Sequence, residues 1–149
     1  MPFPLGNLQL EELTAGPDPT MTPEEAKKWW RYKKVARDFK WISPDKHHKV
    51  LVKAGRFLNG ASIPGFFGIL WWILGTPFGP FCTASAVHDQ LYYDGENRGM
   101  ADNAFSAVAQ ECPAVKMWKR RVATGFLLFF GWYTWRRVRG RLFWNRSKP

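Results

Sequence analysis

Residues 80–113 read PFCTASAVHDQLYYDGENRGMADNAFSAVAQECP, and the interpretation of the fold starts from this stretch. Small and apolar residues recur through it at helical spacing, while Asp94-Gly95 gives a stop in the middle and Pro113 gives one at the end. The pattern predicts two helices, from about Pro80 to Tyr93 and from about Met100 to Cys112. Because the loop between them is short, the second helix should return antiparallel to the first.

Four polar side chains interrupt this predicted helix pair. His88 and Asp89 are adjacent, and Tyr92 follows four residues after the histidine, so His88 and Tyr92 share a helix face. The antiparallel return brings Asp102 back close to Tyr92. Most neighbours are small or apolar, so a charge here must be paired or bound to something.

Two interpretations of this cluster follow from its chemistry. A carboxylate hydrogen-bonded to the imidazole would fix its tautomer and raise the basicity of the other ring nitrogen, as in a general base that activates water. The same side chains can instead hydrogen-bond to one another and hold the helices together with no substrate involved.

Upstream of the helix pair the sequence predicts a small antiparallel sheet. Between Val35 and Ile63, short apolar runs alternate with the turn signals Ser43-Pro44-Asp45, Ala54-Gly55 and Asn59-Gly60, which favours two or three strands. Three further helices are predicted, from Thr22 to about Lys34, from Ile69 to Leu74 and from about Ala114 to Arg139. The expected fold is therefore α+β, a small β-meander followed by a bundle of three to four helices.

Length and composition bound the organisation of the chain. The 149 residues fit an N-terminal flexible arm, residues 1–20, and a single α+β domain, residues 21–149, that ends in a basic helix. The arm contains four prolines and lacks the basic-then-apolar pattern of a signal peptide, so secretion by that route is not expected. Only Cys82 and Cys112 are present, which argues against a disulfide framework and for a reducing compartment.

A net charge of +10 favours an anionic partner. The basic helix concentrates it in four arginines, Arg136, Arg137, Arg139 and Arg141. Tryptophans beside them suit contact with an anionic membrane surface, and the same arginines could bind nucleic acid phosphates without base specificity. The uncharged run from Val122 to Trp135 is shorter than the roughly 20 residues that cross a bilayer core.

Three motifs resemble, in order, those of one known family: Phe57-Leu58-Asn59-Gly60-Ala61-Ser62-Ile63-Pro64, His88-Asp89-Gln90-Leu91-Tyr92 and Ala101-Asp102-Asn103-Ala104-Phe105. Together they resemble domain-of-unknown-function family 1353, over roughly Val35 to Arg137. The resemblance implies a phage or prophage protein, located in the virion or in the host cytoplasm, with other phage proteins as partners. The family usually has Asp where this chain has Asn59. If that carboxylate bound a metal, this chain has lost a negative charge at the site; if it only capped a turn, Asn serves equally well.

The His-Asp-x-x-Tyr helix with a later Asp is also similar to the core of phospholipase A2 enzymes, including those of parvoviral capsids. That resemblance implies that His88 is the base, Asp89 a Ca²⁺ ligand and Asp102 the carboxylate that orients the histidine, with Tyr92 in support. The loop carbonyls that such a site needs would come from residues 75–79 or from Asn59-Gly60. His47-His48, with His88-Asp89 and Asp102, also allow a metal-dependent phosphohydrolase.

The sequence allows three functions. The first is a phage accessory or virion protein with a structural His-Asp cluster, and the second is a calcium-dependent lipid hydrolase similar to phospholipase A2. The third is a basic adaptor that binds nucleic acid or a virion partner through its arginines.

Overall fold

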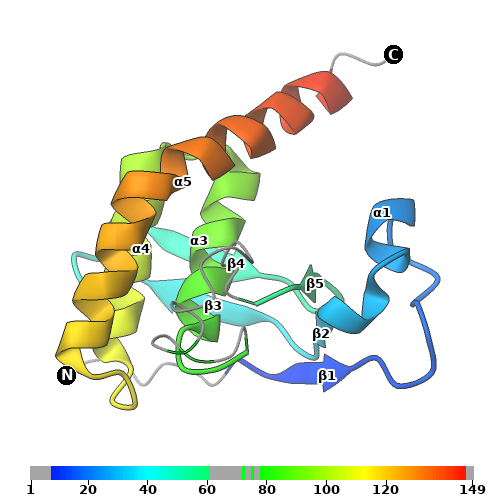
Figure 1. Cartoon of the computed structure of the whole chain (residues 1–149), viewed down its shortest axis with the longest axis horizontal. Helices are drawn as coiled ribbons and strands as arrows, with labels where there is room; N and C mark the ends of the chain where they lie inside the picture. The colour runs from blue at the N-terminus through cyan, green and yellow to red at the C-terminus, as the bar shows by residue number, and fades with distance from the viewer. Residues whose placement is uncertain (1–7, 61–71, 73–74, 76–77, 147–149) are drawn as a thin grey trace.

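The computed structural model describes residues 8–60, 72, 75 and 78–146 (Figure 1). Its elements in chain order are β1 (Leu10–Glu12), α1 (Pro23–Ala26), the 3₁₀ turn η1 (Trp29–Arg31), β2 (Lys33–Val35), β3 (Phe39–Ile42), β4 (Lys49–Val52), β5 (Phe57–Leu58), α3 (Cys82–Asp94), α4 (Arg98–Glu111) and α5 (Met117–Arg146). Short antiparallel strands precede long helices, so the predicted α+β class is confirmed.

The strands form two small sheets. Strands β3 and β4 make a hairpin whose register pairs Phe39 with Val52 and Ile42 with Lys49, around the predicted Ser43-Pro44-Asp45 turn. Strands β1, β2 and β5 make a separate antiparallel sheet with β2 in the centre. The predicted meander is thus divided between two sheets.

Strand β1 lies within residues 1–20, the range predicted to be a flexible arm. It pairs with β2, and Glu12 accepts a 2.8 Å hydrogen bond from Lys33 across the pair. Leu8 and Leu10 also pack against the core. The predicted flexibility of residues 1–20 stays a prediction.

Helix α1 is shorter than predicted. Its start is the expected capping box, in which Thr22 accepts a hydrogen bond from the Glu25 backbone and the Glu25 carboxylate accepts one from the Thr22 backbone. The helix ends at Ala26 instead of near Lys34, because residues 33–35 are recruited into the sheet as β2. Backbone pairing in the sheet prevails there over local helix propensity.

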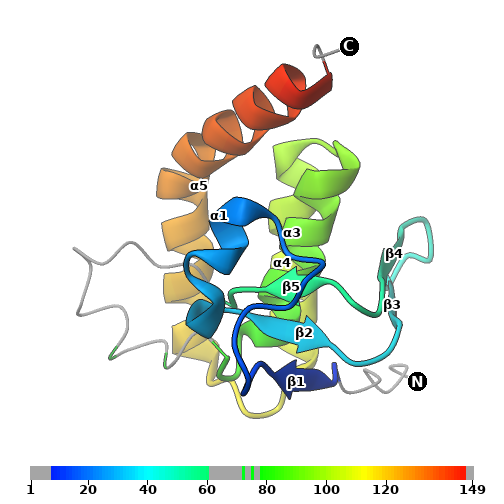
Figure 2. The same ribbon diagram turned by 90° about the vertical axis from the view of Figure 1, so that its right-hand side faces the viewer.

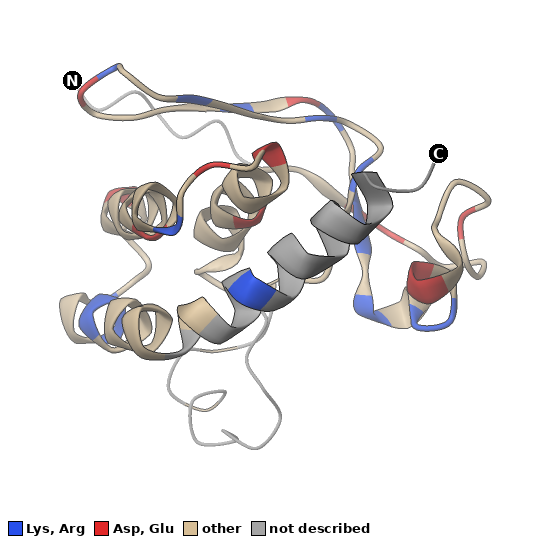
Figure 3. Ribbon diagram, turned by 90° about the horizontal axis from the view of Figure 1, so that it is seen from above, with Lys and Arg blue, Asp and Glu red and all other residues tan. Residues whose placement is uncertain are grey.

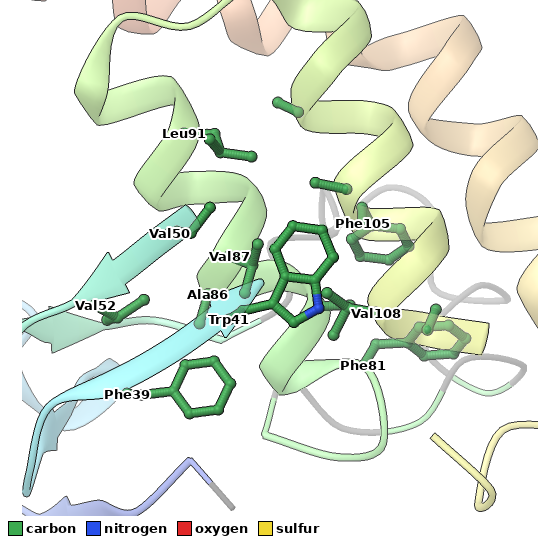
Figure 4. Packing of buried hydrophobic residues seen from close by; sticks show 14 of the residues in the cluster. Phe39, Trp41, Val50, Val52, Phe81, Ala86, Val87, Leu91, Phe105 and Val108 are labelled. Atoms are coloured by element: carbon green, nitrogen blue, oxygen red, sulfur yellow. The ribbon is translucent and has the colours of Figure 1, made fainter. Parts of the chain in front are cut away.

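The core lies between the β3–β4 hairpin and the helices α3 and α4 (Figure 4). Burial alternates along β4, so Val50 and Val52 face the core while Leu51 faces outward. Figure 4 shows Val50 beside Leu91 of α3, and Trp41 of β3 extending toward α4. Helix α3 is the central element, since it packs against α4, β4 and α5.

The predicted helix pair is confirmed, with α3 and α4 within two residues of the expected bounds. Helix α5 starts three residues later than expected and continues to Arg146. It runs along α4 and then extends beyond the other helices (Figures 1 and 2). The helix predicted over residues 69–74 falls almost entirely outside the described residues. Within the described part of the chain, no helix combines the length and the apolar character needed to cross a membrane.

The alternation along β4 gives a direct test of the core. Val52→Ala removes two buried carbon atoms from a fully buried side chain, and we expect the free energy of unfolding to fall by about 2 kcal/mol. Leu51→Ala truncates its neighbour on the same strand, which is 39% exposed, and should cost less than about 1 kcal/mol. Urea unfolding of both variants measures the difference, and equal losses would mean that β4 does not present this face to the core.

Candidate functional site

A tight connection between α3 and α4 positions the candidate site. Helix α3 ends at Gly95, whose φ of 83° lies in the left-handed region that glycine adopts without strain, and the Gly95 N–H donates to carbonyls of the last turn. Two residues later Asn97 caps α4, with its side-chain oxygen accepting a 2.8 Å hydrogen bond from the Met100 N–H. The chain therefore reverses at once, and the first turns of α4 lie against the last turns of α3.

The reversal brings His88 of α3 and Asp102 of α4 into contact. The Nε2 of His88 lies 3.0 Å from Oδ1 of Asp102, and both side chains are buried. On the other side of the ring, Nδ1 faces Oδ1 of Asp89 at 3.5 Å, at the limit of a hydrogen bond. Asp89 is 45% exposed. The imidazole thus lies between a buried carboxylate and one that reaches the surface.

The second oxygen of Asp102 is used by Arg98, a residue that the sequence analysis did not select. Arg98 Nε donates to Asp102 Oδ2 at 3.2 Å, and Arg98 Nη2 donates to the backbone carbonyls of Leu127 and Leu128 in α5 at 3.0 and 2.5 Å. Gly131 lies beside this contact, and a Cβ there would meet Arg98 Nε at 3.4 Å, about van der Waals distance. The spacing of four residues between Arg98 and Asp102 was the available signal, but Arg98 lies before the predicted start of the helix at about Met100.

These contacts form one chain of interactions, the His88–Asp102–Arg98 network. It starts on α3, passes through α4 and ends on the backbone of α5. A buried carboxylate is costly unless hydrogen bonds satisfy it, and here each oxygen of Asp102 has a donor. The network therefore joins the three long helices at one point.

Tyr92 contributes its ring to the site. Its ring centroid lies 4.2 Å from that of His88, with the planes tilted by 45°, as predicted from their shared helix face. Its buried hydroxyl makes no hydrogen bond of good geometry with the described residues, although it lies near Arg98. Burial, together with the nearby Asp102, raises the pKa of Tyr92 far above its usual value. Tyr92 thus packs against His88 without hydrogen-bonding to Asp102.

Opposing effects set the protonation of His88. Burial by itself lowers the pKa of the imidazole, but hydrogen bonds with Asp102 and Asp89 favour the charged form and outweigh it. The pKa of His88 is therefore raised above its ordinary value of 6.5. The folded protein therefore favours the protonated form of His88 over the neutral form.

The described residues do not by themselves make a calcium site. Asp89 offers one half-exposed carboxylate, and calcium takes six to eight oxygen ligands. No group of three or more His, Cys, Asp or Glu side chains suited to a metal occurs in the described part of the chain. Of the predicted loop donors, Thr76 and Pro77 lie outside the described residues. The same finding gives no support to a metal site built on His47 and His48, which lie in the β3–β4 turn.

A cavity of about 580 Å³ lies on a different face of α4. His48 and Asp45 of the hairpin turn and Met100 and Asn103 of α4 are among its lining residues, whereas His88 and Asp102 are not. The cavity is therefore separate from the His88–Asp102–Arg98 network.

The predicted anionic-surface residues are only partly described. Arg136 is exposed on α5, and its guanidinium lies 5.4 Å from the ring centroid of Trp132. The side chains of Arg137, Arg139 and Arg141 lie outside the described part of the structure. Figure 3 shows the described cations spread along α5, the β2–β5 region and the segment near α1.

Comparison with known families matches residues 33–124 to the family described as "Protein of unknown function (DUF1353)". The chain belongs to this family. The match includes His88, Arg98 and Asp102, but it ends inside α5, before the carbonyls that Arg98 binds and before Arg136. No curated protein and no solved structure matches the chain.

The raised pKa of His88 predicts how stability depends on pH. A group whose pKa is higher in the folded state than in the unfolded state stabilises the fold fully at pH values below its unfolded pKa, here about 6.5. That stabilisation is lost as the pH rises through the pKa of the folded state. Asp102, Asp89 and Arg98 are the charged groups that face it. The free energy of unfolding of the parent, minus that of His88→Gln, should therefore shrink as the pH rises above about 6.5.

Urea unfolding at several pH values measures this difference, and the exposed His47 and His48 cancel because both proteins contain them. A difference that stays constant, or that grows as the pH rises, would mean that the fold does not favour the imidazolium form of His88.

Proposed function

We propose that the protein is an accessory or virion-associated protein of a phage or prophage, in which the His88–Asp102–Arg98 network has a structural role. The observation that supports this most is the use of Asp102: one oxygen contacts His88 and the other accepts from Arg98, which continues to the backbone of α5. The resemblance to family 1353, whose members lie largely in phage and prophage genomes, supports the phage assignment.

A structural role agrees with the burial of the network. His88 and Asp102 are both less than one-tenth exposed, and the aromatic rings of Tyr92 and Phe105 lie against the imidazole. Breaking such a group of contacts leaves a buried charge without a partner, which costs several kcal/mol. The position of α5 relative to α3 and α4 then depends on these side chains, and partner proteins would recognise the resulting surface.

A hydrolase similar to phospholipase A2 is the second candidate, favoured by the orientation of the imidazole. With Nε2–H held by Asp102, Nδ1 faces the half-exposed Asp89 and is the nitrogen that could act as a base. In that function Nδ1 would take a proton from water as the water oxygen attacks an ester carbonyl, and would return it to the departing alcohol. Asp89 would contribute to any metal, with further ligands from outside the described residues.

The two candidates differ in what His88→Gln and Asp89→Asn do. The structural role predicts no ester hydrolysis by the parent on phosphatidylglycerol vesicles at any calcium concentration, together with a loss of about 2 kcal/mol of stability in His88→Gln. Asp89→Asn, on a half-exposed side chain, should cost less than about 1 kcal/mol. Fatty acid release and urea unfolding are measured on the same preparations.

Glu96→Gln, an exposed change in the loop between α3 and α4, is the matched control and should alter neither quantity. Calcium-dependent hydrolysis that disappears in both His88→Gln and Asp89→Asn, but not in Glu96→Gln, would overturn the structural role and establish the hydrolase. Full stability of His88→Gln would also contradict the structural role.

A further inference from the structure

Helix α5 exposes large apolar side chains along much of its described length. The exposed fractions are 50% for Trp118, 60% for Leu128, 77% for Phe129 and 48% for Trp132. An α-helix repeats every 3.6 residues, so position 129 lies about three turns after position 118, and position 132 about four turns after it, on the same side of the helix. Position 128 lies beside them. These four residues form a stripe about 20 Å long, here called the α5 stripe.

Cations accompany the α5 stripe at both ends. Lys119 Nζ lies 5.6 Å from the ring centroid of Trp118, and the Arg136 guanidinium lies 5.4 Å from that of Trp132. Arg121 is exposed one turn after Trp118. The sequence of α5 contains eight Lys and Arg and no Asp or Glu, and the uncharged run from Val122 to Trp135 separates the two basic blocks. The helix is thus apolar in its middle, cationic toward both ends and free of acidic residues.

The inner side of the same helix is fixed to the domain. Arg98 binds the carbonyls of Leu127 and Leu128, Gly131 is buried beneath Arg98, and Ala123 belongs to the core. The side chains of Leu128 and Phe129 therefore point outward from a turn whose backbone is held from behind. Their exposure follows from the way α5 is anchored.

We propose that the α5 stripe is a docking surface for an anionic lipid bilayer, with α5 lying in the plane of the membrane surface. Trp, Phe and Leu side chains beside Lys and Arg are the composition by which interfacial helices bury an apolar face at the headgroup boundary while their cations contact anionic lipids. Each cation that lies over a tryptophan ring can bind a lipid phosphate while the ring enters the interface. No helix in the described part of the chain could cross the bilayer, which is consistent with a helix lying on it.

Charge favours an anionic bilayer over a second copy of the chain, and the apolar side chains favour it over nucleic acid, as the partner of the α5 stripe. Two copies of the chain would bring two acid-free, strongly basic helices together, and like charges oppose that association. Nucleic acid would pair with the cations but would leave Leu128 and Phe129 exposed to water, since phosphate binding buries little apolar surface. An anionic lipid surface satisfies both the cations and the apolar side chains.

The test is binding of the full chain to vesicles of phosphatidylglycerol and phosphatidylcholine, followed by sedimentation, with pure phosphatidylcholine vesicles alongside. The double variant Leu128→Ser, Phe129→Ser should bind the anionic vesicles roughly tenfold more weakly or worse, because it loses the most exposed apolar area. Trp30→Ser is the matched control, an equally exposed aromatic (65%) on η1 outside α5, and should bind as the parent does. Both substitutions are at exposed positions, and circular dichroism confirms that the helices are retained.

Three results would overturn the proposal: no binding of the parent to anionic vesicles, equal binding by the parent and the double variant, or an equal loss in Trp30→Ser. Concentration-dependent dimerisation that the double variant abolishes, without vesicle binding by the parent, would assign the stripe to a second copy instead. Vesicle binding is measured separately from fatty acid release and urea unfolding, so a failure of vesicle binding would leave both candidate roles of the network untouched.

Discussion

The buried carboxylate of Asp102 is the constraint on which the arrangement of the helices depends. It lies in an apolar interior where an unpaired charge would be costly, and it is satisfied by His88 of α3 on one oxygen and Arg98 of α4 on the other. Arg98 then reaches past α4 to two backbone carbonyls of α5, beside Gly131. Three helices are thereby held in one relative position by a few directional contacts, while the apolar core between the β3–β4 hairpin and the α3–α4 pair supplies non-directional stabilisation.

This arrangement connects the interior of the protein with its surface. Because Arg98 holds the backbone of α5 at Leu127 and Leu128, the outer side of that turn presents Leu128 and Phe129 to solvent. The family match covers His88, Arg98 and Asp102 but ends before Leu127, Leu128 and Phe129. The proposed structural role of the network and the proposed lipid-binding face of α5 together account for the buried polar residues and the exposed apolar ones. A hydrolase at the membrane would use the same helix to approach its substrate.

The helix pair and the contact between His88 and Asp102 could be predicted because local signals determine them: helical spacing, the Asp94-Gly95 stop and the short reversal. Strand β1 was not predicted, since three residues in a proline-containing segment have little β-propensity. It forms through backbone pairing with β2 and the packing of Leu8 and Leu10 against the core, which are contacts between residues distant in the sequence. Arg98 was missed because its role depends on α5 lying alongside α4, which no local pattern specifies. The contact between the rings of Tyr92 and His88 follows from their shared helix face, but that face does not direct the Tyr92 hydroxyl at an acceptor, so hydrogen bonding within the cluster does not extend to Tyr92.

The most direct measurement is a double-mutant cycle between His88 and Arg98, which do not bond to each other but share Asp102. If the network acts as a unit, His88→Leu combined with Arg98→Met should cost more than the sum of the single changes, by about 1 kcal/mol or more, because Asp102 is then buried without its two partners. The same cycle between His88 and the exposed Arg121 of α5 should be additive within about 0.5 kcal/mol. Additivity between His88 and Arg98 would contradict the account, since it would mean that the two residues stabilise the fold independently.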